Sequence, residues 1–66
     1  MTPTTEIIVA GGERHRVQGD AKQIEALIID AARGSMMEFA WMIDAESGED
    51  LALNPEHIAM IRALAS

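Results

Sequence analysis

The chain contains no cysteine, so no disulfide can staple its fold and no thiol can serve as a nucleophile or a metal ligand. Its 66 residues make one small domain, and a domain of this size buries only about 60% of the surface that its unfolded chain exposes. Stability must then come from a well-packed core or from association with another chain. The lack of cysteine also fits a reducing compartment, and we expect a cytoplasmic protein.

Long apolar runs are absent as well. No stretch approaches the roughly 18 consecutive apolar residues that are needed to cross a bilayer. The first residues, MTPTTEIIVAGG, lack the basic region and the long apolar core of a secretory signal. We therefore expect no membrane partner. We interpret residues 1–5 as a flexible leader of a single domain that spans residues 1–66.

Basic residues are scarce. The chain has 5 lysines and arginines against 11 aspartates and glutamates, which gives a formal net charge of −6. The one basic cluster, Arg14-His15-Arg16, is much smaller than a phosphate-backbone site requires, so no nucleic-acid partner is expected. A basic protein would suit the acidic half better, although these acids could simply keep a hydrophobic chain soluble. The candidate acidic surface consists of Glu38, Asp44, Glu46, Glu49 and Asp50.

Residue types that support catalysis or cofactor binding are few. Tyrosine is absent, the serines fall at element boundaries, and His15 and His57 are the only histidines. Their spacing resembles neither a catalytic triad nor a zinc site. The two histidines could form a metal site with Glu13 or Glu56 only if the first and last strands pair. We therefore expect no catalytic activity, no cofactor and no metal.

Turn-forming residues divide the chain into elements in the order ββαβββ. The stretch EIIVAGGERHRVQG predicts a hairpin that turns at Gly11-Gly12. A second hairpin, over residues 35–53, turns at the polar run 46–49. The expected fold class is α+β, a small antiparallel sheet with one helix packed on one face.

The stretch GDAKQIEALIIDAARG predicts that helix. Asp20 stands at the N-cap and Gln23 three residues later, which is the spacing of a capping box. The apolar residues recur with helical spacing, and the face expected to meet the sheet consists of Ile24, Leu27, Ile28 and Ala31.

Apolar residues are more numerous than one small core can hold. Twenty large ones follow Met1, so we expect some to remain at the surface for a partner. Residues 36–43 alternate with a period of two, and we expect Phe39, Trp41, Ile43 and Met37 to share one face. Methionine suits adaptable contacts and tryptophan anchors many interfaces. The candidate interface consists of Met36, Ala40, Trp41, Met42 and Met60, with Met36, Ala40 and Met42 expected to point away from the helix.

The last segment, EDLALNPEHIAMIRAL, permits two interpretations. Asn54 as N-cap with Pro55 at the first helical position favours a helix. The apolar spacing beyond His57 instead fits a strand over residues 58–64. The favoured interpretation is a single turn at Asn54–His57 followed by a short strand, and a short helix remains open.

The stretch LNPEHIAMI resembles the end of many small bacterial and phage-encoded proteins, in which a strand leads through Asn-Pro and a turn into a last strand. Its Asn-x-x-His-Ile pattern also resembles the end of the LytTR-type DNA-binding domain. The chain departs from that domain in its acidic composition, so DNA binding is not carried over.

Two functional hypotheses follow. The first is a small protein-interaction module, an adaptor or regulator, that acts as a homo-oligomer through an apolar sheet face or edge. The second is a small acidic inhibitor, of the kind that phages encode, that binds a basic surface of a host protein. The first is favoured by the apolar surplus and the second by the charge.

Overall fold

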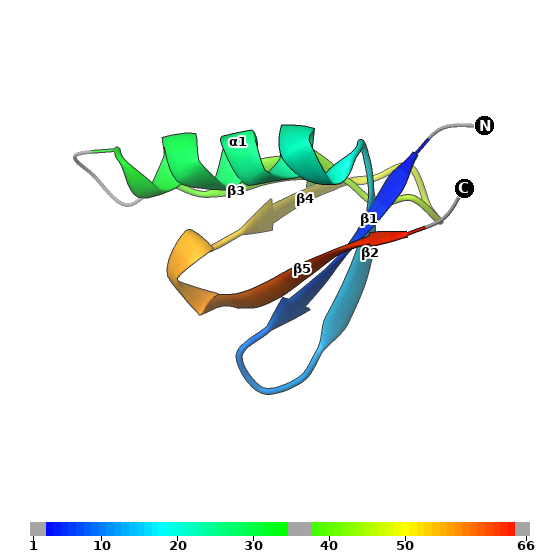
Figure 1. Ribbon diagram of the computed structural model, residues 1–66, viewed down its shortest axis with the longest axis horizontal. Coiled ribbons are helices and arrows are strands. Elements are labelled where there is room, and N and C mark those ends of the chain that lie inside the picture. The colour runs from blue at the N-terminus through cyan, green and yellow to red at the C-terminus, as the bar shows by residue number, and fades with distance from the viewer. Residues whose placement is uncertain (1–2, 35–37, 65–66) are drawn as a thin grey trace.

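The computed structural model describes residues 3–34 and 38–64. The elements follow the order expected from the sequence, with one helix packed on antiparallel strands (Figure 1). They are β1 (Thr4–Val9), β2 (Arg14–Gln18), α1 (Ala21–Ala32), β3 (Ala40–Ile43), β4 (Asp50–Leu53), the 3-10 turn η1 (Pro55–His57) and β5 (Ile58–Leu64). The α+β class and the single helix are therefore confirmed.

The strands form two small sheets. One has the order β2-β1-β5 and the other is the β3-β4 hairpin, and all pairs are antiparallel. The sheets are joined where Val17 pairs with Asp44 and where the Ala45 N–H donates to the Arg16 carbonyl at 2.8 Å. This short junction lets the β3-β4 hairpin turn across the first sheet.

The helix begins as its sequence predicts. The Asp20 carboxylate accepts from the Gln23 N–H at 2.8 Å, and the Gln23 side chain accepts from the Asp20 N–H at 3.0 Å. Ile24 and Ala31 are buried, and Ile28 packs against the core. Leu27, which was expected on the same face, is 43% exposed. It lies at the margin of a contact face that is narrower than the apolar stripe.

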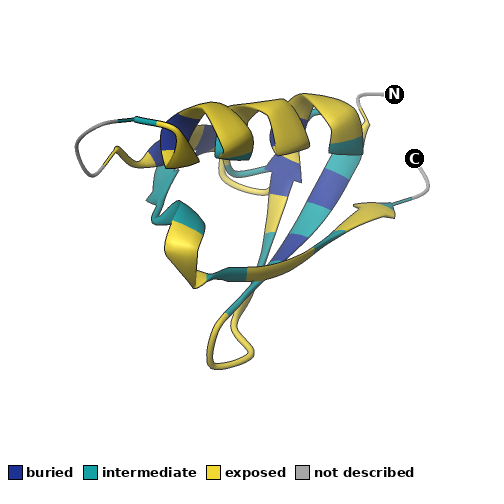
Figure 2. Ribbon diagram, turned by 60° about the vertical axis from the view of Figure 1, so that its left-hand side comes forward, coloured by how far each residue is buried: buried dark blue, intermediate teal, exposed yellow. Residues whose placement is uncertain are grey.

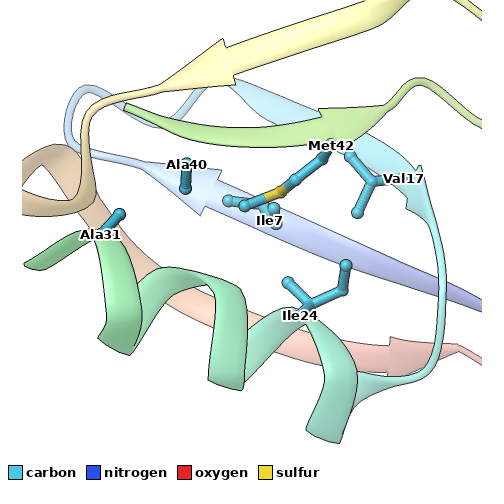
Figure 3. Close-up of a cluster of buried hydrophobic side chains, with 6 residues drawn as sticks. All are labelled: Ile7, Val17, Ile24, Ala31, Ala40 and Met42. Carbon is cyan, nitrogen blue, oxygen red and sulfur yellow. The ribbon is translucent and has the colours of Figure 1, made fainter. Parts of the chain in front are cut away.

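The core lies between α1, the β1-β2 pair and β3 (Figure 3). Its buried apolar side chains are Ile7, Val17, Ile24, Ala31, Ala40 and Met42. Thr5 is fully buried as well, and its hydroxyl donates to the Gly19 carbonyl at 2.9 Å. The flexible leader expected over residues 1–5 is therefore wrong for Thr4 and Thr5, which belong to β1.

The last segment is a turn followed by a strand, which confirms the favoured interpretation. The Asn54 side chain accepts from the Glu56 N–H at 2.9 Å and caps η1. The strand β5 then pairs with β1 over most of its length, with a register shift between Ile8 and Val9. Pairing with β1 satisfies the backbone N–H and C=O groups along one edge of this segment.

In the described part of the chain, no helix is long and apolar enough to cross a membrane.

Candidate interaction surfaces

Three large apolar side chains point outward from the β3 segment. Trp41 is 65% exposed, Phe39 48% and Ile43 42%. They alternate with the buried Ala40 and Met42, so they share the outer face of the β3-β4 hairpin. We call these three residues the β3 face. An exposed tryptophan flanked by two large apolar groups is unusual for a monomer surface and typical of a contact site.

The expected orientation of this strand is wrong. Ala40 and Met42 were assigned to the outer face, yet they are 2% and 4% exposed. Figure 3 shows Met42 reaching toward Ile7 inside the core. The expected alternation of the side chains is present, but the buried and exposed faces are exchanged. Both faces of this strand are apolar, so the sequence does not show which one is buried. Ala40 lies in the same buried cluster as Ala31 of α1 (Figure 3).

Two other candidate interface residues, Met60 and Trp41, do lie at the surface. Met60 lies in β5 and is 49% exposed, so it is available for contact. Trp41 is also available for contact, as expected of a candidate interface residue. Met36 lies outside the described residues. Of the five candidates, the structure thus leaves Trp41 and Met60 at the surface and removes Ala40 and Met42.

The candidate acidic surface lies close to the β3 face in the chain. Glu38 immediately precedes it, and Glu46, Glu49 and Asp50 occupy the β3-β4 turn and the start of β4. All four are exposed, and Asp44 is half-buried. The apolar outer face of β3 is therefore bounded by acids at both ends of the strand.

Asp44 organises the acidic turn. Its carboxylate accepts from the Ser47 hydroxyl at 2.7 Å and from the Glu46 N–H at 3.2 Å. The Ser47 hydroxyl in turn accepts from the Glu49 N–H at 3.2 Å. These bonds favour the charged form, and the hydrogen bond from Ser47 lowers the pKa of Asp44 most. The Asp44 carboxylate therefore keeps its charge to a lower pH than a free aspartate would.

The two histidines line one hollow, of about 360 Å³, between the β1-β2 hairpin and the β4-η1 segment. The Nε2 atom of His15 lies 2.9 Å from the Oε1 atom of Glu13. His57 and Phe39 also line the hollow. The first and last strands do pair, as a histidine metal site would need. Even so, no three histidine, aspartate or glutamate side chains within residues 3–34 and 38–64 converge as a metal site.

A second surface is an open sheet edge, which the interaction-module hypothesis had allowed for. β5 pairs with β1 along one edge, and within the described residues its other edge carries no partner strand (Figure 2). The sequence of this strand contains no acid and a single base, Arg62. Such a weakly charged strand is poorly protected against pairing with another strand. The Nη1 atom of Arg62 lies 3.8 Å from the Oε1 atom of Glu6 in β1. Which edge would stay open depended on the sheet order, and the pattern of residues does not give that order.

No family model matches this chain, and neither a curated protein nor a solved structure does.

Proposed function

We propose that the protein is a small protein-interaction module, an adaptor or regulator of the cytoplasm, that acts as a homo-oligomer through an apolar sheet face or edge. One observation carries the proposal. Among the residues that the structure describes, six large apolar side chains are 41–65% exposed, whereas the buried core also has six apolar members, two of which are alanines. The exposed six are Leu27, Ile29, Phe39, Trp41, Ile43 and Met60.

This distribution is costly for an isolated chain. Burying a large apolar side chain stabilises a fold by about 1.5–3 kcal/mol relative to leaving it exposed. A domain of 66 residues has little stability to spare. Covering part of the exposed set in an assembly would therefore add a substantial share of the total stability.

Association should make the stability depend on concentration. A homo-oligomer unfolds with a thermal midpoint that rises with protein concentration, because assembly stabilises only the folded chain. We expect the midpoint from circular dichroism to fall by several degrees over roughly a hundredfold dilution. Coinciding midpoints would show that the chain unfolds as a monomer and would refute the proposed homo-oligomer.

A second function is favoured by the acids that bound the β3 face. Two copies that met through this face would bring like charges together, which opposes association. A partner with an apolar centre and a basic rim would meet complementary charge instead. This arrangement supports the inhibitor hypothesis, in which the acidic surface binds a basic surface of a host protein.

Charge reversal can test this second function with a lysine-rich peptide as the probe. Glu49→Lys changes the acidic surface, and Glu25→Lys makes the same change in net charge on the exposed side of α1. We expect Glu49→Lys to weaken binding more than Glu25→Lys, and the difference to shrink at high salt. Equal losses would mean that only the net charge matters, and the acidic surface would then have no role of its own.

A further inference from the structure

We propose that two copies of the chain pair along the free edge of β5, antiparallel and with Ile61 opposite Ile61 of the second copy. This inference rests on the proposed self-association and specifies the surface that carries it. The two three-stranded sheets would join into one, in the order β2-β1-β5-β5-β1-β2. The β3 face would remain open on each copy for a different partner.

The hydrogen bonds of β1 show which groups of β5 are already used. Val9 donates to the Glu13 carbonyl at 3.0 Å, on the β2 side of β1. Ala10 donates to the His57 carbonyl at 2.6 Å, on the β5 side. Residues of an antiparallel strand bond alternately to its two neighbours. The even-numbered residues of β1 therefore bond to β5, where their register partners are Met60, Arg62 and Leu64.

The intervening residues of β5 direct their backbone groups to the free edge. By the same alternation, the N–H and C=O groups of Ile61 and Ala63 point away from β1. The register shift falls at the start of β5, opposite Ile8 and Val9. The part from Met60 to Leu64 is regular, and it can accept another strand.

The sequence of β5 is close to symmetric about its centre. Ile61 is flanked by Ala59 and Ala63, and the strand ends in Ile58 and Leu64. In an antiparallel pair centred on Ile61, each alanine meets an alanine and each terminal apolar residue meets another. This self-matching favours a second copy over an unrelated strand as the occupant.

Charge selects this register over its neighbours. If one strand slid by two residues relative to the other, the centre of the pair would move from Ile61 to Arg62. Arg62 would then lie directly opposite Arg62 of the second copy, and like charges in that position are destabilising. The opposite slide would centre the pair on Met60 and bring the second strand against η1. In the proposed register, Arg62 faces Met60 of the second copy, and the two guanidinium groups stay apart.

The outer edge of β4 is a poorer candidate. β4 has four residues against seven in β5. It begins at Asp50, directly after Glu49, so self-pairing there would bring acids close together. Short strands and charges are the means by which proteins protect such edges.

Cysteine cross-linking tests the register, since the chain has no native cysteine. Met60 and Arg62 of the second copy would form a non-hydrogen-bonded pair, with Cα atoms about 4.5 Å apart, which is within disulfide range. The double variant Met60→Cys/Arg62→Cys should yield a covalent dimer on mild oxidation. Each single variant should stay monomeric on a denaturing gel, because like positions would then be more than about 7 Å apart.

Every other outcome overturns the inference. A covalent dimer from Arg62→Cys alone, or from Met60→Cys alone, would show a slipped register. If the double variant forms no cross-link while the wild-type chain still dimerises, the β5 edge is not the interface. Self-association would then have to use another surface. A monomeric wild-type chain would instead refute the proposed function itself.

A backbone variant tests the same edge without cysteine. Ala63→Pro removes one outward-facing N–H, and proline is tolerated in edge strands where that group faces solvent. Ala63→Val keeps the N–H and serves as the control. We expect a halved solution mass for Ala63→Pro and an unchanged mass for Ala63→Val, with circular dichroism confirming that both are folded. A dimeric, folded Ala63→Pro would contradict pairing at this edge.

Discussion

Met42 and Trp41 are neighbours in the chain and occupy opposite environments. The Met42 side chain is 4% exposed and contributes to the core, whereas Trp41 is 65% exposed on the β3 face. The sequence could not assign this phase, because methionine and alanine on one side and aromatics on the other are all apolar. Local packing decides it: the sites near Ala31 and Ile7 accept Ala40 and Met42, and the bulky rings remain outside.

The two environments predict opposite responses to truncation. Met42→Ala should lower the free energy of unfolding by about 2–5 kcal/mol, because it leaves a cavity in the core. Trp41→Ala should change that free energy by no more than about 0.5 kcal/mol when the protein is dilute. Urea denaturation followed by circular dichroism measures both. A larger loss for Trp41→Ala than for Met42→Ala would place the indole in the core.

Asp44 gives a prediction that depends on pH. Its pKa is lowered from 3.8 mainly by the hydrogen bond from the Ser47 hydroxyl. A lowered pKa stabilises the fold above the unfolded-state pKa, and this contribution is lost as the pH falls through the folded-state value. Ser47→Ala should therefore raise the pKa of Asp44 toward 3.8. A carboxyl titration by NMR measures the shift, and an unchanged pKa would show that the hydroxyl does not hold the carboxylate.

At the scale of elements, local signals were sufficient where they were strong. Asp20 and Gln23 predicted the start of α1, Gly11-Gly12 predicted the first turn, and Asn54-Pro55 predicted η1. The division into two sheets was not predictable, because it depends on where Val17 meets Asp44, a contact between residues far apart in the chain. The same holds for the pairing of β5 with β1, and hence for the open edge of β5.

The cap of η1 predicts a modest effect on stability. Asn54→Ala removes the acceptor of the Glu56 N–H and should cost about 1 kcal/mol. Asn54→Asp keeps a side-chain oxygen at that position and should be nearly neutral. Urea denaturation measures the free energy of unfolding of each variant, and hydrogen exchange at the Glu56 amide reports the loss of the cap itself. Equal stability of Asn54→Ala and the wild-type chain would mean that the cap contributes nothing.

At the scale of the whole molecule, apolar groups and charges are distributed unevenly. The acids gather around the ends of β3, while β5 from Ile58 to Leu64 contains no acid. A dimer formed through β5 would bring together two chains that each carry a net charge of −6. Salt screens this general repulsion. We therefore expect the dimer to be as stable or more stable at high ionic strength, as dissociation constants at two salt levels would show.

The mass of the wild-type chain in solution tests the central claim most directly. We would measure it by light scattering coupled to size exclusion, at two concentrations and two salt levels. Self-association through β5 predicts a mass of twice 7.2 kDa at the higher concentration, maintained at high salt. A mass of 7.2 kDa under all four conditions would contradict the homo-oligomer and, with it, the pairing through β5.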